Sequence, residues 1–103
     1  MSEGVVYEFD WDAAKALSNA RKHGVTFDEA TTVFLDALAL TVYDAVSSQG
    51  EDRWFTLGFN SNGTLLAVSH THQFVSPTGA RIRIISARRA TRAERKSYED
   101  EPR

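Results

Sequence analysis

Apolar residues recur at two different intervals along this chain, and the interval changes near residue 39. Before that point, apolar side chains follow one another at three or four positions, which is the spacing of one face of an α-helix. After it, β-branched and aromatic residues gather in short runs that are typical of strands. The pattern therefore predicts helices in the first third of the chain and a sheet after them.

The two expected helices both have recognisable ends. Residues 5–9, "VVYEF", form a short strand or an extended lead-in, and Asp10 or Asp12 then caps a helix that runs through residues 13–23 and ends at Gly24. Thr26 and Glu29 have the spacing of a capping box, so a second helix begins there.

Four strands are expected at residues 39–44, 52–59, 64–72 and 80–87. The sequence "NSNG" at 60–63 predicts a tight hairpin between the second and third, because Asn and Gly accept a positive φ. We expect residues 73–79, "QFVSPTG", to form a longer, mobile connection, because Pro77 and Gly79 break regular structure.

A last helix is predicted at residues 92–100, where Thr91 and Glu94 repeat the capping-box spacing. The expected fold class is thus α+β, with two N-terminal helices, a four-stranded antiparallel sheet and a C-terminal helix. A chain of 103 residues suits one domain, and we expect a single domain over residues 1–103.

The composition is that of a soluble globular protein, with 42% hydrophobic and 25% charged residues. No cysteine is present, which removes disulfides and thiolate metal sites and fits a reducing compartment. We find neither a leader segment nor an apolar run of membrane-spanning length. We therefore expect a cytoplasmic protein without a membrane partner.

Charge is distributed very unevenly along the chain. The formal net charge is -2, yet ten of the 14 acidic residues lie within residues 1–52, and seven of the 12 Lys and Arg lie within residues 81–96. The period of two in a strand places Arg81 and Arg83 on the face opposite Ile82 and Ile84. The sequence continues with further basic residues: Arg88, Arg89, Arg92, Arg95 and Lys96.

Such a single-sign cluster favours a phosphate-binding surface, because the planar guanidinium matches two phosphate oxygens. An acidic protein surface would satisfy the same arginines, and the pattern does not separate these two partners. A half-solvated strand whose polar side happens to be arginine is the structural alternative.

Other candidates for chemistry lie outside the basic run. Imidazole is the side-chain type best suited to proton transfer near neutral pH, so His23 could transfer a proton, with Lys22 beside it as a phosphate contact, although both also suit a helix C-terminus. Glu51 and Arg53 share one face of a strand entrance, and Tyr98 could stack on a base or anchor the last helix. His70 and His72 share a strand face, but without a clear third ligand we expect no metal and no cofactor.

Three segments together resemble the BrnT family of bacterial type II toxins: "FDWDAAKALSNARKHGVTFDEA", "EDRW" and "RIRIISARRATRAERKSYE". Two features depart from the family pattern, namely the length of the segment at residues 71–80 and Arg89, where lysine is common. The resemblance spans nearly the whole chain.

This resemblance implies a RelE-like fold, a metal-independent endoribonuclease activity that inhibits translation, and a BrnA-like antitoxin partner in a hetero-oligomer. Carried over by position, the family's candidate functional residues are Lys22, His23, Glu51, Arg53, Arg81, Arg83 and Tyr98. With the residues of the basic run, we expect catalysis from His23, Glu51, Arg81 and Arg83. The residues expected to bind RNA or phosphate are Lys22, Arg53, Arg88, Arg89, Arg92 and Tyr98.

Two other functions are consistent with the basic surface. One is a non-catalytic module that docks an acidic protein partner or folds a disordered antitoxin segment. The other is DNA binding, which the sequence disfavours because it has no helix-turn-helix pattern and no Asn or Gln for base readout in the last helix.

Overall fold

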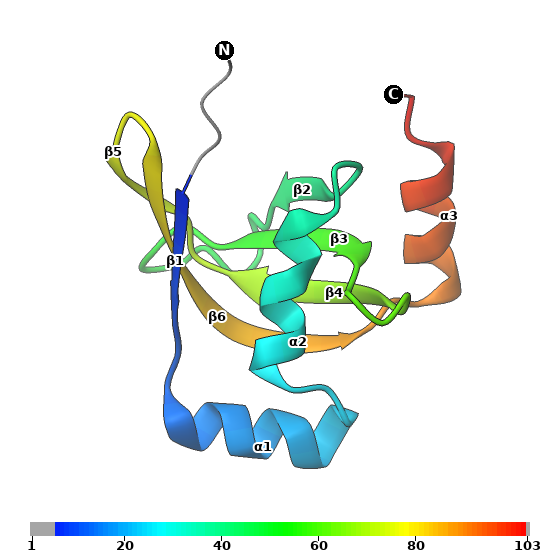
Figure 1. Ribbon diagram of the computed structural model, residues 1–103, viewed down its shortest axis with the longest axis horizontal. Coiled ribbons are helices and arrows are strands. Elements are labelled where there is room, and N and C mark those ends of the chain that lie inside the picture. Colours follow the sequence, from blue (N-terminus) through cyan, green and yellow to red (C-terminus); the bar gives the residue numbers. More distant parts are fainter. Residues whose placement is uncertain (1–5, 103) are drawn as a thin grey trace.

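The computed structural model describes residues 6–102, so residue 5 of the first expected strand lies outside the described part. The elements follow in the order β1 (Val6–Asp10), α1 (Ala13–His23), α2 (Phe27–Thr31), the 3₁₀ helix η1 (Thr32–Leu35), β2 (Leu40–Tyr43), β3 (Trp54–Phe59), β4 (Leu65–His70), β5 (Gln73–Ser76), β6 (Gly79–Arg89) and α3 (Arg92–Asp100). Figure 1 shows α1 and α2 packed beside the strands, with α3 at the far end of the sheet.

The helix ends confirm the capping predictions. Asp12 accepts a hydrogen bond from the Lys15 amide, and Gly24 ends α1 with a left-handed φ of 68°. Thr26 caps α2 through the Glu29 amide. At α3 the full capping box forms, because Thr91 and Glu94 each accept a hydrogen bond from the other's backbone amide. Local sequence therefore determined where these helices begin.

The sheet differs from the predicted one in strand number and in direction. It has six strands in the order β1-β6-β4-β3-β2, with β5 paired to β6. The antiparallel part was expected, but β1 runs parallel to β6, with Val6 opposite Gly79 and Asp10 opposite Arg83. The prediction of a four-stranded antiparallel sheet was therefore wrong, and the α+β class was right. The predicted β3–β4 hairpin is present, with Gly63 at a φ of 80°.

The segment at residues 73–79 was wrongly predicted to be a mobile connection. β5 extends β4 beyond an irregularity at residues 71 and 72, and it turns back into β6 through Pro77 and Thr78. Pairing continues through the irregularity, because the Thr71 amide donates to the Arg83 carbonyl at 3.0 Å. Proline causes no conflict in this position, since it lies in the turn and not in a paired strand.

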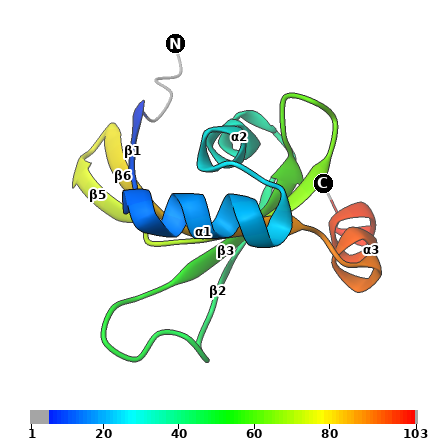
Figure 2. The same cartoon turned by 90° about the horizontal axis from the view of Figure 1, so that it is seen from below.

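The two faces of the sheet have different coverings. One face, called here the helix-bearing face, is covered by α1, α2 and η1, and its core includes Phe27, Val33, Val68, Ile82 and Ile84. Figure 2, seen from below, shows α2 on one side of the strands and the loop between β2 and β3 projecting on the other.

The opposite side, called the open face, is covered only at one end. There Tyr98 of α3 packs with Leu57, Leu65 and Ala67 in a smaller core. The rest of the open face, towards β1 and β5, carries polar and charged side chains, and it is the region where the site has to be sought.

Candidate nucleic-acid interface

Four of the arginines that the structure describes lie on the open face: Arg53, Arg81, Arg83 and Arg88. We call this set the arginine face. Ile82 and Ile84 are fully buried in the helix-bearing core, whereas Arg81 and Arg83 alternate with them and are exposed. Arg88 lies opposite Ala67, which belongs to the open-face core. The alternation predicted from the sequence "RIRI" is confirmed.

Arg53, which directly precedes β3, and Arg83 of β6 reach the same region of the open face. Trp54 is opposite the buried His70, so the preceding Arg53 points to the open face. Thr71 follows His70 and pairs with Arg83, so it lies between the two arginines. Two strand spacings separate their backbones, about 10 Å at about 4.8 Å per strand. Both long side chains can thus contact one phosphodiester group.

Three of these arginines make weak surface ion pairs. Arg81 lies 3.4 Å from Glu8, Arg83 lies 3.7 Å from Asp10, and Arg53 lies 4.0 Å from Glu51. Exposed pairs of this kind contribute roughly 0–1 kcal/mol each. Their carboxylates can therefore be exchanged for phosphate oxygens at small cost.

Arg88 has a much stronger partner. Its guanidinium donates two hydrogen bonds to Glu94, at 2.7 and 2.9 Å, and lies 5.8 Å from the Phe55 ring centroid. These hydrogen bonds raise the pKa of Arg88 and lower the pKa of Glu94. Both shifts favour the charged forms of the two side chains. Arg88 therefore joins α3 to the sheet, and a phosphate would have to break this bidentate pair.

Glu8 and Asp10 are site residues that sequence reasoning missed. Both lie on β1 directly opposite Arg81 and Arg83, with their carboxylates on the open face. The alternation in "YEFD" could have indicated that Glu8 and Asp10 share a face, because Tyr7 and Phe9 pack on the helix-bearing core. What the sequence could not show was that β1 pairs with β6.

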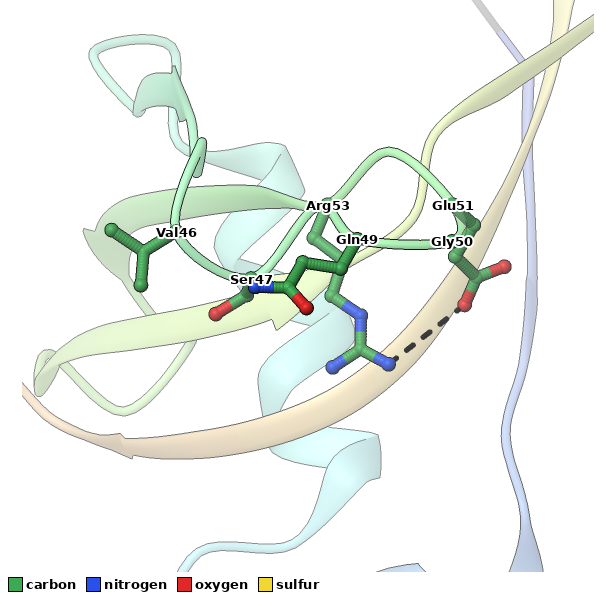
Figure 3. Close-up of a pocket in the computed structure, with 6 residues that line it drawn as sticks. All are labelled: Val46, Ser47, Gln49, Gly50, Glu51 and Arg53. Carbon is green, nitrogen blue, oxygen red and sulfur yellow. Dashed lines mark ion pairs between the residues drawn. The ribbon is translucent and has the colours of Figure 1, made fainter.

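Glu51 and Arg53 line a hollow of about 660 Å³ together with Val46, Ser47, Gln49 and Gly50. Figure 3 shows the carboxylate and the guanidinium pointing toward each other from the loop before β3. Arg53 Nε is buried and has no hydrogen-bond partner among the described residues. An incoming oxygen atom could pair with this donor once the side chains that bury it move.

Lys22, His23 and Arg89 do not join the arginine face. Lys22 and His23 end α1, which packs on the helix-bearing side, and both are exposed. Arg89 lies opposite Leu66, a residue of the helix-bearing core. Asn19 of the same helix contacts Ala87, so α1 meets β6 beyond Arg83 and its carboxylate neighbours.

Tyr98 and Arg92 lie on α3. Tyr98 is 6% exposed, packs on Phe59, and donates a hydrogen bond of 2.6 Å to Asp36. Its ring is therefore used for packing, which is the anchoring role considered from the sequence. Arg92 is exposed at the first turn of α3, away from β1.

The two histidines of the β4 region lie on the helix-bearing side. His70 is fully buried, with Nε2 2.7 Å from Thr56 Oγ1 and Nδ1 donating to the Thr71 carbonyl. Burial lowers the pKa of His70 to about 4 and also lowers the pKa of His72. Within residues 6–102, no group of three or more His, Asp or Glu side chains could hold a metal ion.

The fold and the site together define a class: a small α+β protein with helices on one sheet face and carboxylate-paired arginines on the other. The chain belongs to the BrnT family, because the model described as "Ribonuclease toxin, BrnT, of type II toxin-antitoxin system" matches residues 11–94. The resemblance seen in the sequence is confirmed. As a toxin family of such systems, it implies an antitoxin protein as partner.

A solved structure agrees in fold. The crystal structure of the Brucella abortus ribonuclease toxin BrnT is similar with a TM-score of 0.60 and 19% identity, over 84% of this chain and 100% of that one. No curated protein matches the chain. Among the described residues, no helix is both long and apolar enough to span a membrane.

Proposed function

We propose that this chain is a metal-independent endoribonuclease that cleaves RNA in the cytoplasm and thereby inhibits translation. The observation that carries the proposal is the convergence of Arg53 and Arg83 on one open surface beside carboxylates. Membership of a ribonuclease toxin family supports it. A BrnA-like antitoxin is the proposed protein partner, and it would neutralise the toxin by covering the same arginines.

The proposed chemistry uses the ribose 2′-hydroxyl as the nucleophile. A carboxylate on the open face accepts its proton, and the 2′-oxygen attacks the neighbouring phosphorus while the bond to the 5′-oxygen breaks. Arg53 and Arg83 stabilise the negative charge that develops on the phosphorane oxygens. The leaving 5′-oxygen takes a proton from solvent water, the carboxylate later returns its proton to solvent, and the products are a 2′,3′-cyclic phosphate and a 5′-hydroxyl end.

The candidates for the general base differ in how close they lie to Arg53 and Arg83. Glu51 is 4.0 Å from Arg53, and Asp10 is 3.7 Å from Arg83, so either lies near a phosphate held by these arginines. His23, the other sequence candidate, lies at the C-terminal end of α1 and is not among the described ion-pair partners of these arginines. We therefore assign proton transfer to the carboxylates.

The test is cleavage of single-stranded RNA by purified protein in EDTA. We expect 2′,3′-cyclic ends, and Arg83→Ala should lower the rate by roughly 10²–10³-fold, the usual effect of removing one transition-state donor. Arg95→Ala is a matched control, because Arg95 is equally exposed and pairs with Glu99 at 3.8 Å on α3. Intact RNA with the folded wild-type protein in excess would favour the non-catalytic binding module instead.

A further inference from the structure

A small aromatic pocket lies on the helix-bearing side of the sheet, between the start of β3 and β5. It measures about 200 Å³ and is lined by Thr41, Trp54, His72 and Phe74. We call it the aromatic pocket. Trp54 lies opposite the buried His70, and Thr41 lies opposite the buried Thr56, which places both on that side. It is thus distinct from the arginine face.

The lining suits a flat, apolar ring system. Phe74 is 67% exposed, although it is a large aromatic residue, and its ring centroid lies 4.8 Å from that of His72. Trp54 meets Tyr43 edge to face at 5.1 Å, so its ring is held in one orientation. Pockets for drug-sized molecules measure roughly 300–1,000 Å³. The aromatic pocket is smaller, and it therefore fits one planar ring system.

One polar atom in this lining has no partner. His72 Nε2 is buried without a hydrogen bond among the described residues. Desolvation lowers the pKa of His72, which favours the neutral imidazole. An occupant with hydrogen-bonding groups on a flat ring would satisfy Nε2 when the side chains that bury it move, whereas an aliphatic side chain of a protein would leave it unpaired.

The pocket borders the arginine face along two stretches of backbone. Trp54 directly follows Arg53, and His72 directly follows Thr71, whose amide is bonded to the Arg83 carbonyl. Alternation sends each neighbour to the other side of the sheet. A strand of nucleic acid whose phosphate contacts Arg53 and Arg83 would therefore meet the aromatic pocket by passing around this margin.

We propose that the aromatic pocket binds one unpaired nucleobase of the RNA substrate, next to the phosphate held by Arg53 and Arg83. Trp54 and Phe74 stack on the base, and His72 contacts its polar edge. This inference rests on the proposed ribonuclease function and adds a base subsite to it. Base stacking tolerates all four bases, so the subsite gives affinity for single strands and a preference that depends on the His72 contact.

The experiment measures binding separately from cleavage. A 2′-O-methyl RNA oligonucleotide, which cannot be cut because its 2′-oxygens are blocked, is titrated into the full chain carrying Trp11→Phe. Trp54 is then the remaining tryptophan, and stacking should quench its fluorescence. In a parallel anisotropy titration that keeps Trp11, Phe74→Ala should weaken binding roughly 5- to 150-fold, the range found for loss of one stacked base.

Val75→Ala provides the matched control. Val75 is the neighbour of Phe74 on β5 and is 48% exposed, but it does not line the pocket. Binding by Val75→Ala should equal that of the parent. An abasic oligonucleotide should bind the parent and Phe74→Ala equally, because it has phosphates and no base to insert.

The outcomes separate this inference from the proposed function. RNA cleavage with equal oligonucleotide affinity in Phe74→Ala and its parent would overturn the base subsite and leave the ribonuclease standing. Base-dependent binding without cleavage would support the base subsite and contradict the proposed ribonuclease activity. If Phe74→Ala weakened only the complex with the antitoxin, the pocket would be a protein-docking site and the inference would be wrong.

Discussion

Asn19 is predicted to be one of the residues on which the fold depends most. It is 7% exposed in α1, and its side-chain amide makes three hydrogen bonds. Nδ2 donates to the carbonyls of Val25 and Ala87, at 3.0 and 2.8 Å, and Oδ1 accepts from the Ala87 amide at 3.1 Å. β1 stops at Asp10, opposite Arg83, so it does not reach this part of β6. Asn19 therefore takes the place of a strand partner at Ala87.

The cost of Asn19→Ala follows from the groups it leaves behind. Two carbonyls and one amide lose their partners inside the protein, and an unsatisfied buried group costs about 1–3 kcal/mol. The free energy of unfolding should then fall by at least about 3 kcal/mol. Small domains have only about 5–15 kcal/mol in total, so this single change removes a large share.

Urea denaturation of the purified variant measures this loss. With a slope of about 1–1.5 kcal/mol per molar urea, the midpoint should fall by about 2 M or more. Ser18→Ala, an exposed neighbour on the same helix, should leave the midpoint nearly unchanged. If Asn19→Ala unfolded within about 1 kcal/mol of the parent, the strand-partner role of Asn19 would be refuted.

Two further predictions concern Tyr98 and the buried His70. Tyr98→Phe removes the 2.6 Å hydrogen bond to Asp36 and should lower the free energy of thermal unfolding by about 1.5–3 kcal/mol. RNA cleavage per folded molecule should not change. Lost cleavage in a folded variant would instead show that the Tyr98 hydroxyl takes part in the reaction. Burial lowers the pKa of His70 from 6.5 to about 4. Between these two pH values the unfolded state therefore binds more protons than the folded state, and the free energy of unfolding decreases as the pH falls. Between pH 6.5 and pH 5 the loss should be about 1.5 kcal/mol by denaturation, and a slope unchanged in His70→Gln would contradict this assignment.

Local sequence rules accounted for the helices and one hairpin because the interactions that form them are themselves local. Asp12, Thr26 and Thr91 each bond an amide three residues ahead, and Gly63 needs only its own φ. The pairing of β1 with β6 joins residues about 70 positions apart, and nothing in "VVYEF" specifies that partner. For the same reason β5 was missed, since its pairing with β6 outweighs the breaking effect of Pro77.

Part of the candidate site followed from alternation alone, which placed Arg81 and Arg83 on a shared face. Alternation could not predict that Arg88, unlike the other arginines, has a strong bidentate partner. That pairing depends on the Glu94 side chain reaching back across the turn before α3. Glu94 was expected to cap the helix, and it does so while it also pairs with Arg88. The sequence "KHG" also has a structural explanation, since it ends the helix that carries Asn19 to β6.

The uneven charge distribution acquires a physical role once the sheet is assembled. The carboxylates that meet the arginine face, Glu8, Asp10 and Glu51, all come from the acidic first half of the chain. They pair weakly with the guanidinium groups while no RNA is bound, and they repel an incoming phosphate that displaces them. Repulsion lowers affinity for substrate and product alike, yet a carboxylate remains beside the bound phosphate. A proton acceptor for the 2′-hydroxyl is required at that position, so we infer that the acidic half neutralises the basic run and also provides its base.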